Sequence, residues 1–135
     1  MGKDYDEIGV WSEVKLDIVR RYASEYSKIL TAQKQGFKHI YIDAFAGRGV
    51  HLSRRTGEWV PGSPLNALGI QPPFQEFHFI DVDGNRTAQL RETAGNRPDV
   101  FTYEGDCNEI LPSQVFPRAE RSEYRRALCL LDPTT

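Results

Sequence analysis

Cysteine and long apolar runs are both scarce in this sequence. Its 135 residues include two cysteines, Cys107 and Cys129, without the C-x-x-C spacing of common metal sites. A chain of this length can bury a core without disulfides. No stretch approaches the roughly 20 apolar residues that cross a membrane, and no basic, apolar leader precedes the start MGKDYDE. We therefore expect a reduced, cytoplasmic protein with no membrane span and no metal site.

An excess of charge of either sign is also lacking. Lys and Arg number 17, Asp and Glu number 19, and 39% of the residues are hydrophobic. This composition is typical of one globular domain and excludes a disordered tail. Because the chain has no overall basic footprint, any contact with nucleic acid must be local.

Basic side chains do gather at two places. One group could meet phosphates and contains Arg48, His51, Arg54 and Arg55. In the other, over residues 118–126, glutamates lie between the arginines, which favours a solvated helix with local ion pairs. His39 and His78 alternate with apolar strand-like residues, so we expect both to be structural.

Helical and strand-like patterns alternate along the chain. After Ser12, a candidate N-cap, apolar residues recur at helical spacing from Val14 to Ile29. Residues 50–62 are polar and rich in glycine, which indicates a long loop or a small hairpin. Strands are expected at 39–46, 76–81, 99–103 and 127–132. One helix is expected to begin after Ser63 as N-cap, and a second to cover residues 85–94. A helical turn interrupted at Pro112 is expected next, followed by a third helix over residues 118–126.

This alternation predicts the fold class. Strands separated by helices imply right-handed crossovers and a parallel sheet covered on both faces. We predict an α/β, doubly wound, mostly parallel sheet of Rossmann-like type, preceded by a helix. Residues 1–36 would form the amino-terminal helical segment, and residues 37–135 the Rossmann-like domain.

Polar residues and glycines follow each expected strand, at the edge where parallel sheets bind ligands. The first strand leads into DAFAGRG, which begins at Asp43 and contains Gly47 and Gly49. The second ends at Asp81, whose carboxylate could accept hydrogen bonds from both hydroxyls of a ribose. The third ends in Gly105-Asp106-Cys107 and the fourth in Asp132-Pro133.

The glycine pattern favours one nucleotide cofactor over another. It lacks the third glycine of the dinucleotide fingerprint. In a dinucleotide-binding βαβ unit the acidic residue follows by roughly 20 residues, whereas Asp81 follows Asp43 by more, mainly because of the insertion at residues 50–62. NAD is therefore a poorer candidate than S-adenosylmethionine, which has no pyrophosphate. An ordinary strand-to-loop turn without a ligand is the alternative.

The motifs together resemble a known family. WSEVKL, YIDAFAGRG, GSPLNAL, FHFID, GDCNEIL and LLDP occur in this order over nearly the whole chain. They are similar to the three-Cys-motif partner protein (TcmP) family, a bacterial group that looks like class I S-adenosylmethionine-dependent methyltransferases.

The resemblance implies roles for individual residues. Gly47 and Gly49 would pass beneath the methionine part of S-adenosylmethionine, with Asp43 near its amino group. Asp81 would bind the ribose, and Asp106 and Cys107 would border the adenine. Ala44 and Phe45 belong to the same cofactor-binding loop, in which Phe45 is expected to pack. The cysteines of the family name belong to a partner, so Cys107 and Cys129 are not expected to bind metal.

The resemblance places the methyl-transfer chemistry at Asp132 and Pro133. Amino-methylating enzymes carry an acidic or amide residue there, followed by prolines and an aromatic ring that stacks on a flipped base. Here Thr134 and Thr135 replace the second proline and the aromatic residue. Asp132 would orient an amino nucleophile; an Asp that only caps the strand end is the alternative.

Three functions follow as expectations. The first is methyl transfer from S-adenosylmethionine to an amino or other nucleophile on nucleic acid. The second is a non-catalytic binding subunit that acts with a three-Cys-motif partner protein, which the altered loop after Asp132 favours. The third is a nicotinamide-dependent oxidoreductase.

The resemblance also implies a strand order and an extent. Methyltransferase-like sheets order their first four strands 3, 2, 1, 4 and add more beyond the fourth. We therefore expect the chain to be the amino-terminal part of a longer domain, with the strand at 127–132 as an apolar edge that needs a cover.

Overall fold

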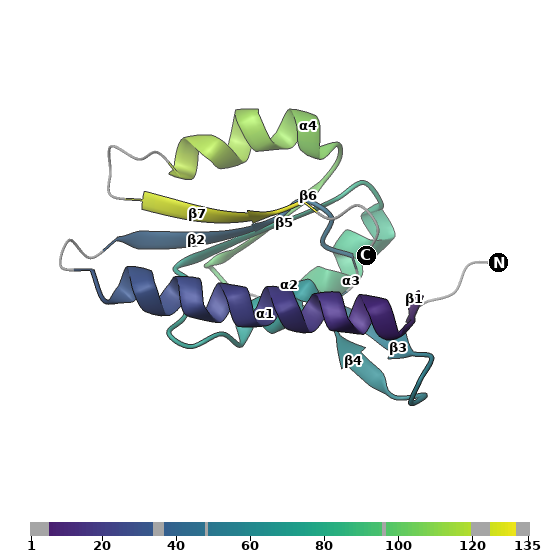
Figure 1. The fold of residues 1–135 in the computed structure, drawn as a ribbon. Helices are drawn as coiled ribbons and strands as arrows, with labels where there is room; N and C mark the ends of the chain where they lie inside the picture. Colours follow the sequence, from purple (N-terminus) through teal and green to yellow (C-terminus); the bar gives the residue numbers. More distant parts are fainter. Residues whose placement is uncertain (1–5, 34–36, 48, 96, 120–124, 132–135) are drawn as a thin grey trace.

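The computed structural model describes residues 6–33, 37–47, 49–95, 97–119 and 125–131 (Figure 1). Its centre is a four-stranded sheet in the order β6-β5-β2-β7, with every neighbouring pair parallel. The strands are β2 (Lys38–Asp43), β5 (Glu76–Asp81), β6 (Val100–Glu104) and β7 (Arg125–Leu130). The predicted α/β class, the parallel sheet and the strand order 3, 2, 1, 4 are confirmed.

Helices cover both faces of this sheet, as predicted for a doubly wound fold. In Figure 1, α1 (Val10–Thr31), α2 (Ser63–Leu68) and α3 (Gly84–Ala94) lie on one side, and α4 (Cys107–Ile110) lies on the other. Alternate residues of β2 and β5 pack into two separate hydrophobic cores, one on each face of the sheet. Tyr41 and Phe79 pack toward α1, α2 and α3, whereas Ile42 and Ile80 pack toward α4 and the residues after it.

A second, smaller sheet is formed near the start of α1. It contains β1 (Asp6–Ile8), β3 (Val50–Ser53) and β4 (Trp59–Pro61), in the order β1-β3-β4. The antiparallel pair β3 and β4 confirms the hairpin that was one of two predictions for residues 50–62. The parallel pairing of β1 with β3 was not predicted. β1 has only three residues, two of them acidic, and so short a segment shows no strand pattern.

Several predicted element boundaries are wrong. The first strand ends at Asp43 instead of 46, because the chain turns at Ala44 and Phe45. Ser12 lies inside α1, which Gly9 precedes as N-cap, and Gly62, not Ser63, is the N-cap of α2.

The predicted basic helix over 118–126 is also wrong. The helical segment after α4 continues through Pro112 as a π-helix (Leu111–Val115) and a 3-10 helix (Phe116–Ala119), and Arg125 and Arg126 begin β7. Tertiary contacts accommodate these two arginines in a strand. Arg125 Nη1 donates to the carbonyl of Arg118 over 2.8 Å, and the Arg126 guanidinium lies 4.3 Å from the centre of the Phe37 ring.

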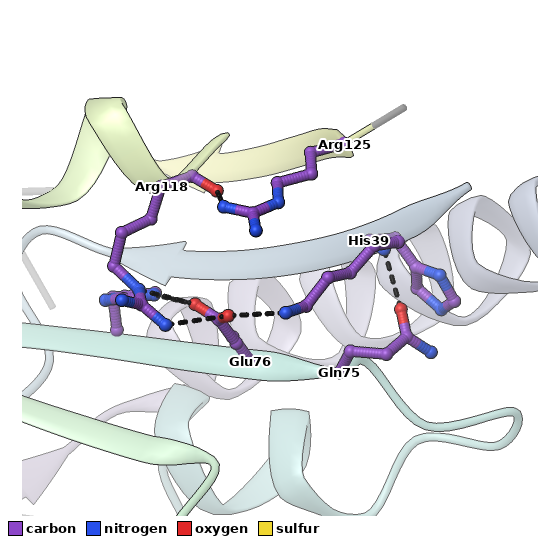
Figure 2. Close-up of polar contacts among 7 residues, drawn as sticks. His39, Gln75, Glu76, Arg118 and Arg125 are labelled. Atoms are coloured by element: carbon purple, nitrogen blue, oxygen red, sulfur yellow. Dashed lines mark hydrogen bonds and ion pairs between the residues drawn. The ribbon is translucent and has the colours of Figure 1, made fainter. Parts of the chain in front are cut away.

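An ion cluster around the buried Glu76 carboxylate holds the amino ends of β2 and β5, opposite the edge where ligands are expected (Figure 2). The Glu76 carboxylate accepts two hydrogen bonds from Arg118, at 2.9 and 3.0 Å, and pairs with Lys38 at 2.8 Å. Burial by itself would raise the pKa of Glu76, but these contacts and one with His78 outweigh it and bring the pKa to about 2. Glu76 thus ties the chain after α4 to the sheet.

The two histidines predicted to be structural are hydrogen-bonded in the core. His39 Nε2 lies 2.9 Å from Ser27 Oγ, and His78 bonds the Tyr103 hydroxyl over 2.9 Å and Glu76 over 3.0 Å. Burial lowers the pKa of both rings, so both are neutral at pH 7. This prediction is confirmed. Within the described residues, no helix is both long and apolar enough to span a bilayer.

Candidate functional site

A cavity of about 280 Å³ opens at the carboxyl ends of β2, β5 and β6. Its wall combines the turn after β2, the hairpin, and the first residues of α2 and α4. The lining residues are Leu16, Ala44, Phe45, Ala46, Gly47, His51, Ser63, Asp81, Val82, Arg86, Asp106, Cys107 and Asn108. Six of the eight predicted cofactor-binding residues are therefore brought together at one cavity. Asp43 and Gly49 are not part of its lining.

Asp81 forms the centre of the wall. It is 8% exposed, and its carboxylate accepts hydrogen bonds from the backbone N–H groups of Asp83, at 2.9 Å, and Gly47, at 3.1 Å. A carboxylate has about four acceptor positions. Two backbone donors therefore leave capacity for hydroxyl donors of a ligand in the cavity.

The turn after β2 is held against β5 by its own backbone. Ala46 N–H donates to the carbonyl of Ile80 over 2.9 Å, and Gly47 N–H donates to Asp81. Gly47 has φ +77°, a left-handed conformation that glycine adopts without a steric cost. The turn therefore has a defined shape, and it presents Phe45 and the small residues Ala44, Ala46 and Gly47 to the cavity.

Asp43 lies behind this wall. It is 1% exposed, it accepts a short hydrogen bond from the Ser63 hydroxyl, and its other oxygen accepts from the N–H of Phe45 over 3.2 Å. Asp43 therefore acts on the cavity through Ser63 and the turn. Its predicted proximity to the amino group of a ligand stays a prediction.

Gly49 serves the packing of helices. It has φ +99°, and a Cβ at this position would lie 3.2 Å from Leu90 and 3.5 Å from Leu65. Its carbonyl accepts a 2.6 Å hydrogen bond from Gly62 N–H, which closes the hairpin against the turn after β2. Gly49 thus shapes the cavity by drawing the two glycine segments together.

The segment between β6 and α4, with the first residue of α4, supplies the remaining predicted residues. The Asp106 side chain accepts a hydrogen bond from Asn108 N–H over 2.8 Å and so caps α4. Cys107 is buried against the core cluster that also contains Cys129, and both thiols are free. Burial raises the pKa of Cys129, so its thiol is protonated at pH 7.

The structure adds residues that were not predicted to bind a cofactor. His51, expected in a phosphate-binding group, is 5% exposed and lines the cavity, whereas Arg54 and Arg55 of that group are exposed on the hairpin. Arg86 on α3 also lines the cavity, with guanidinium nitrogens 3.9 Å from Asp81 and from Asp83. Arg86 follows Asp81 by five positions in the sequence, and no motif marks it as a ligand-binding residue.

The structure does not place three of the predicted residues. Asp132, Pro133 and Arg48 lie outside the described residues. Within the described part of the chain, no three His, Cys, Asp or Glu side chains gather in a way that could hold a metal ion.

Comparisons with protein families, with curated proteins and with solved structures find no match to this chain. The family resemblance therefore stays a prediction from motifs, and the function must be argued from the cavity and its residues.

Proposed function

We propose that this protein binds S-adenosylmethionine in the cavity and transfers its methyl group to an amino or other nucleophile on nucleic acid. In this proposal it is a cytoplasmic, class I methyltransferase-like protein of the TcmP family. The observation that carries it is the position of Asp81: a nearly buried carboxylate with spare acceptor capacity, hydrogen-bonded to a glycine turn, at the carboxyl edge of a 3, 2, 1, 4 parallel sheet.

Along the edge of the sheet, successive lining residues suit successive parts of this cofactor. Asp81, at the end of β5, would accept the ribose hydroxyls. Asp106, Cys107 and Asn108 follow β6, the next strand outward, and would border the adenine. The small residues of the turn after β2 would leave room for the methionine part. The cavity volume of about 280 Å³ lies just below the roughly 300–1,000 Å³ typical of ligand sites.

The same turn disfavours NAD. Dinucleotide folds hold the pyrophosphate on free N–H groups of the glycine turn and the helix that follows it directly. Here the N–H groups of Ala46 and Gly47 are already bonded to β5, and the hairpin separates the turn from α2. A ligand without a pyrophosphate fits this arrangement better.

When bound, the cofactor would supply an electrophilic methyl group on a positively charged sulfur. The protein would then have to place a nucleophile in line with that methyl and keep its lone pair available. We assign the orientation of the nucleophile to Asp132, with Pro133 fixing the backbone after it.

A calorimetric titration with S-adenosylmethionine, S-adenosylhomocysteine and NAD tests the proposal. We expect binding of the first two ligands and no binding of NAD. Binding of NAD alone would instead indicate an oxidoreductase, and binding of none of the three would refute the cofactor assignment.

A second assay separates catalysis from binding. Methyl-tritiated cofactor is incubated with total nucleic acid and protein, and label in the nucleic acid fraction is expected. The replacement of an aromatic residue by Thr135 favours a competing proposal, a non-catalytic subunit that acts with a three-Cys-motif partner. Cofactor binding without label transfer, in the presence of that partner, would support the subunit instead.

A further inference from the structure

The outward side of α1 carries a stripe of large apolar side chains. In Figure 1, α1 runs along the outside of the fold, and Leu16, Ala23 and Ser27 form its buried side. The members of the stripe are each at least 60% exposed, and they are Trp11, Ile18, Tyr22 and Ile29. An exposed apolar stripe of this kind marks a surface that contacts another molecule.

The stripe has the spacing of a coiled-coil seam. Alternating steps of four and three residues lead through Trp11, Lys15, Ile18, Tyr22, Glu25 and Ile29. These are the steps between the a and d positions of a heptad repeat, whose side chains all face one partner helix. Two seam positions carry exposed charges of opposite sign, Lys15 and Glu25. A partner helix that fits must present the complementary charges at matching positions.

A second copy of α1, lying antiparallel, supplies these charges. If a two-fold axis passes beside Arg20, residues equally far from Arg20 on its two sides face each other across the axis. The facing pairs are Trp11 with Ile29, Lys15 with Glu25, and Ile18 with Tyr22. Each pair occurs twice, because a two-fold interface uses the same surface of both copies. The stripe is therefore complementary to itself in charge as well as in apolar contact.

Other arrangements of two copies lose this match. A parallel pair would set Lys15 against Lys15 of the second copy and Glu25 against Glu25, and both contacts are repulsive. An antiparallel pair shifted by one heptad would set Lys15 against Ile18 or Glu25 against Tyr22, so a charge would face an apolar side chain. The two charges thus determine both the direction and the register of the pair.

The charges beside the stripe do not oppose this pairing. Arg21 lies on its flank, and its Nε is 2.9 Å from a carboxylate oxygen of Asp17. Glu25 pairs with Lys28 of the same helix over 3.3 Å, and more than half of each side chain is exposed. Because exposed ion pairs contribute little stability, Glu25 can turn to Lys15 of the second copy at little cost.

We propose that α1 is the interface of an antiparallel, two-fold dimer of this chain, in which Lys15 pairs with Glu25 of the second copy. Leu16 lines the cavity from the opposite side of α1, so the dimer leaves both cavities open. The proposal therefore does not depend on the ligand of the cavity. Because the seam belongs to one helix, we expect a small, reversible interface with a dissociation constant in the micromolar range.

Reversal of the two charges tests the proposal. Lys15→Glu brings two glutamates together in each facing pair, and Glu25→Lys brings two lysines together. In sedimentation equilibrium, the dissociation constant of each single variant should be about tenfold higher than that of the wild type, or more. The double variant, with both reversals in one chain, should dimerise as the wild type does, because opposite charges again face each other.

An equimolar mixture of the two single variants gives an independent readout. One chain then carries only glutamates at these two positions and the other only lysines, so both facing pairs of a mixed dimer are attractive. The mixture should dimerise at concentrations where each variant alone is a monomer. Glu92→Lys, at an exposed position on α3, makes the same change of charge as Glu25→Lys away from the stripe. This control should dimerise as the wild type does.

Each alternative result would overturn the proposal. A wild-type protein that is monomeric at every concentration would assign the stripe to a partner other than this chain. Single variants that are folded by circular dichroism and dimerise as strongly as the wild type would place the interface elsewhere. A double variant and a mixture that both dimerise as weakly as the single variants would show that Lys15 and Glu25 do not face each other.

Discussion

The carboxylate of Asp81 accepts a hydrogen bond from the backbone N–H of Gly47, with 3.1 Å between Oδ2 and N. This contact joins the end of β5 to the turn after β2, although the two residues are 34 positions apart. The other oxygen of the same carboxylate accepts from Asp83 N–H. One side chain therefore shapes the cavity and offers the acceptor that a ribose would use.

Asp81→Asn should weaken cofactor binding while the protein stays folded. The amide keeps the size of the side chain but loses the charge, so the affinity for S-adenosylhomocysteine should fall about tenfold or more. Asp83→Asn is the matched control, because Asp83 is the neighbouring carboxylate that caps α3 and does not line the cavity. Calorimetry checks both variants, and an Asp81→Asn protein with wild-type affinity would remove Asp81 from the site.

Asp132→Asn should separate methyl transfer from binding. Asp132 is proposed to orient the nucleophile and not to hold the cofactor, so the affinity for S-adenosylhomocysteine should change little. Label transfer to nucleic acid should fall about a hundredfold or more, the low end of the usual general acid–base contribution. Equal labelling by the variant and the wild type would exclude Asp132 from the mechanism.

Glu76→Gln should change how stability depends on pH. The pKa of Glu76 is about 2 in the folded protein, against an ordinary value of 4.5, so the unfolded chain binds this proton more readily. The stabilisation from the carboxylate is therefore complete above about pH 4.5 and is lost as the pH falls through about 2. Glu76→Gln should lower the free energy of unfolding near pH 7 by about 2 kcal/mol and flatten the acid slope.

Urea unfolding at several pH values measures this change. Glu92→Gln, an exposed position on α3, is the control and should keep both the stability and the slope. A Glu76→Gln protein that loses stability between about pH 5 and 2 as steeply as wild type would show that another group is responsible.

The outer surface of α1 should promote self-association. Trp11, Ile18 and Tyr22 are 79%, 60% and 62% exposed, and Ile18 and Tyr22 continue into an apolar groove with Leu128 and Leu130 of β7. In the described part of the chain β7 is an edge strand, and unpaired apolar edges favour association. Light scattering of the 135-residue protein should show an apparent mass that rises with concentration.

Ile18→Lys should reduce this association and leave the stability within about 0.5 kcal/mol, because the side chain is already exposed. Thr31→Lys adds the same charge at the end of α1, outside the groove, and should have little effect. A wild-type protein that stays a monomer at all concentrations would contradict the prediction.

The sequence by itself determined those helices, strands and turns that are marked by patterns of a few neighbouring residues. The apolar pattern of β5 predicts a strand and the spacing of apolar residues in α1 predicts a helix, because each backbone has a fixed periodicity. The glycines after β2 predict a turn, because glycine adopts positive φ without a steric cost. The position of Asp81 at a strand end followed in the same way. Because parallel strands share one carboxyl edge, the convergence of Ala44, Gly47, Asp81 and Asp106 could be predicted before any contact was known.

Only the tertiary structure decided which side chains enter the cavity and which support it. Asp43 ends a strand as Asp81 does, yet it is buried against Ser63. His51 reaches the cavity from a segment whose sequence pattern fitted a loop as well as a hairpin. Arg125 and Arg126 lie in β7 although their segment has a helical charge pattern. In each case contacts between residues distant in sequence outweigh local preferences worth only a few tenths of a kcal/mol, so no local pattern could have revealed them.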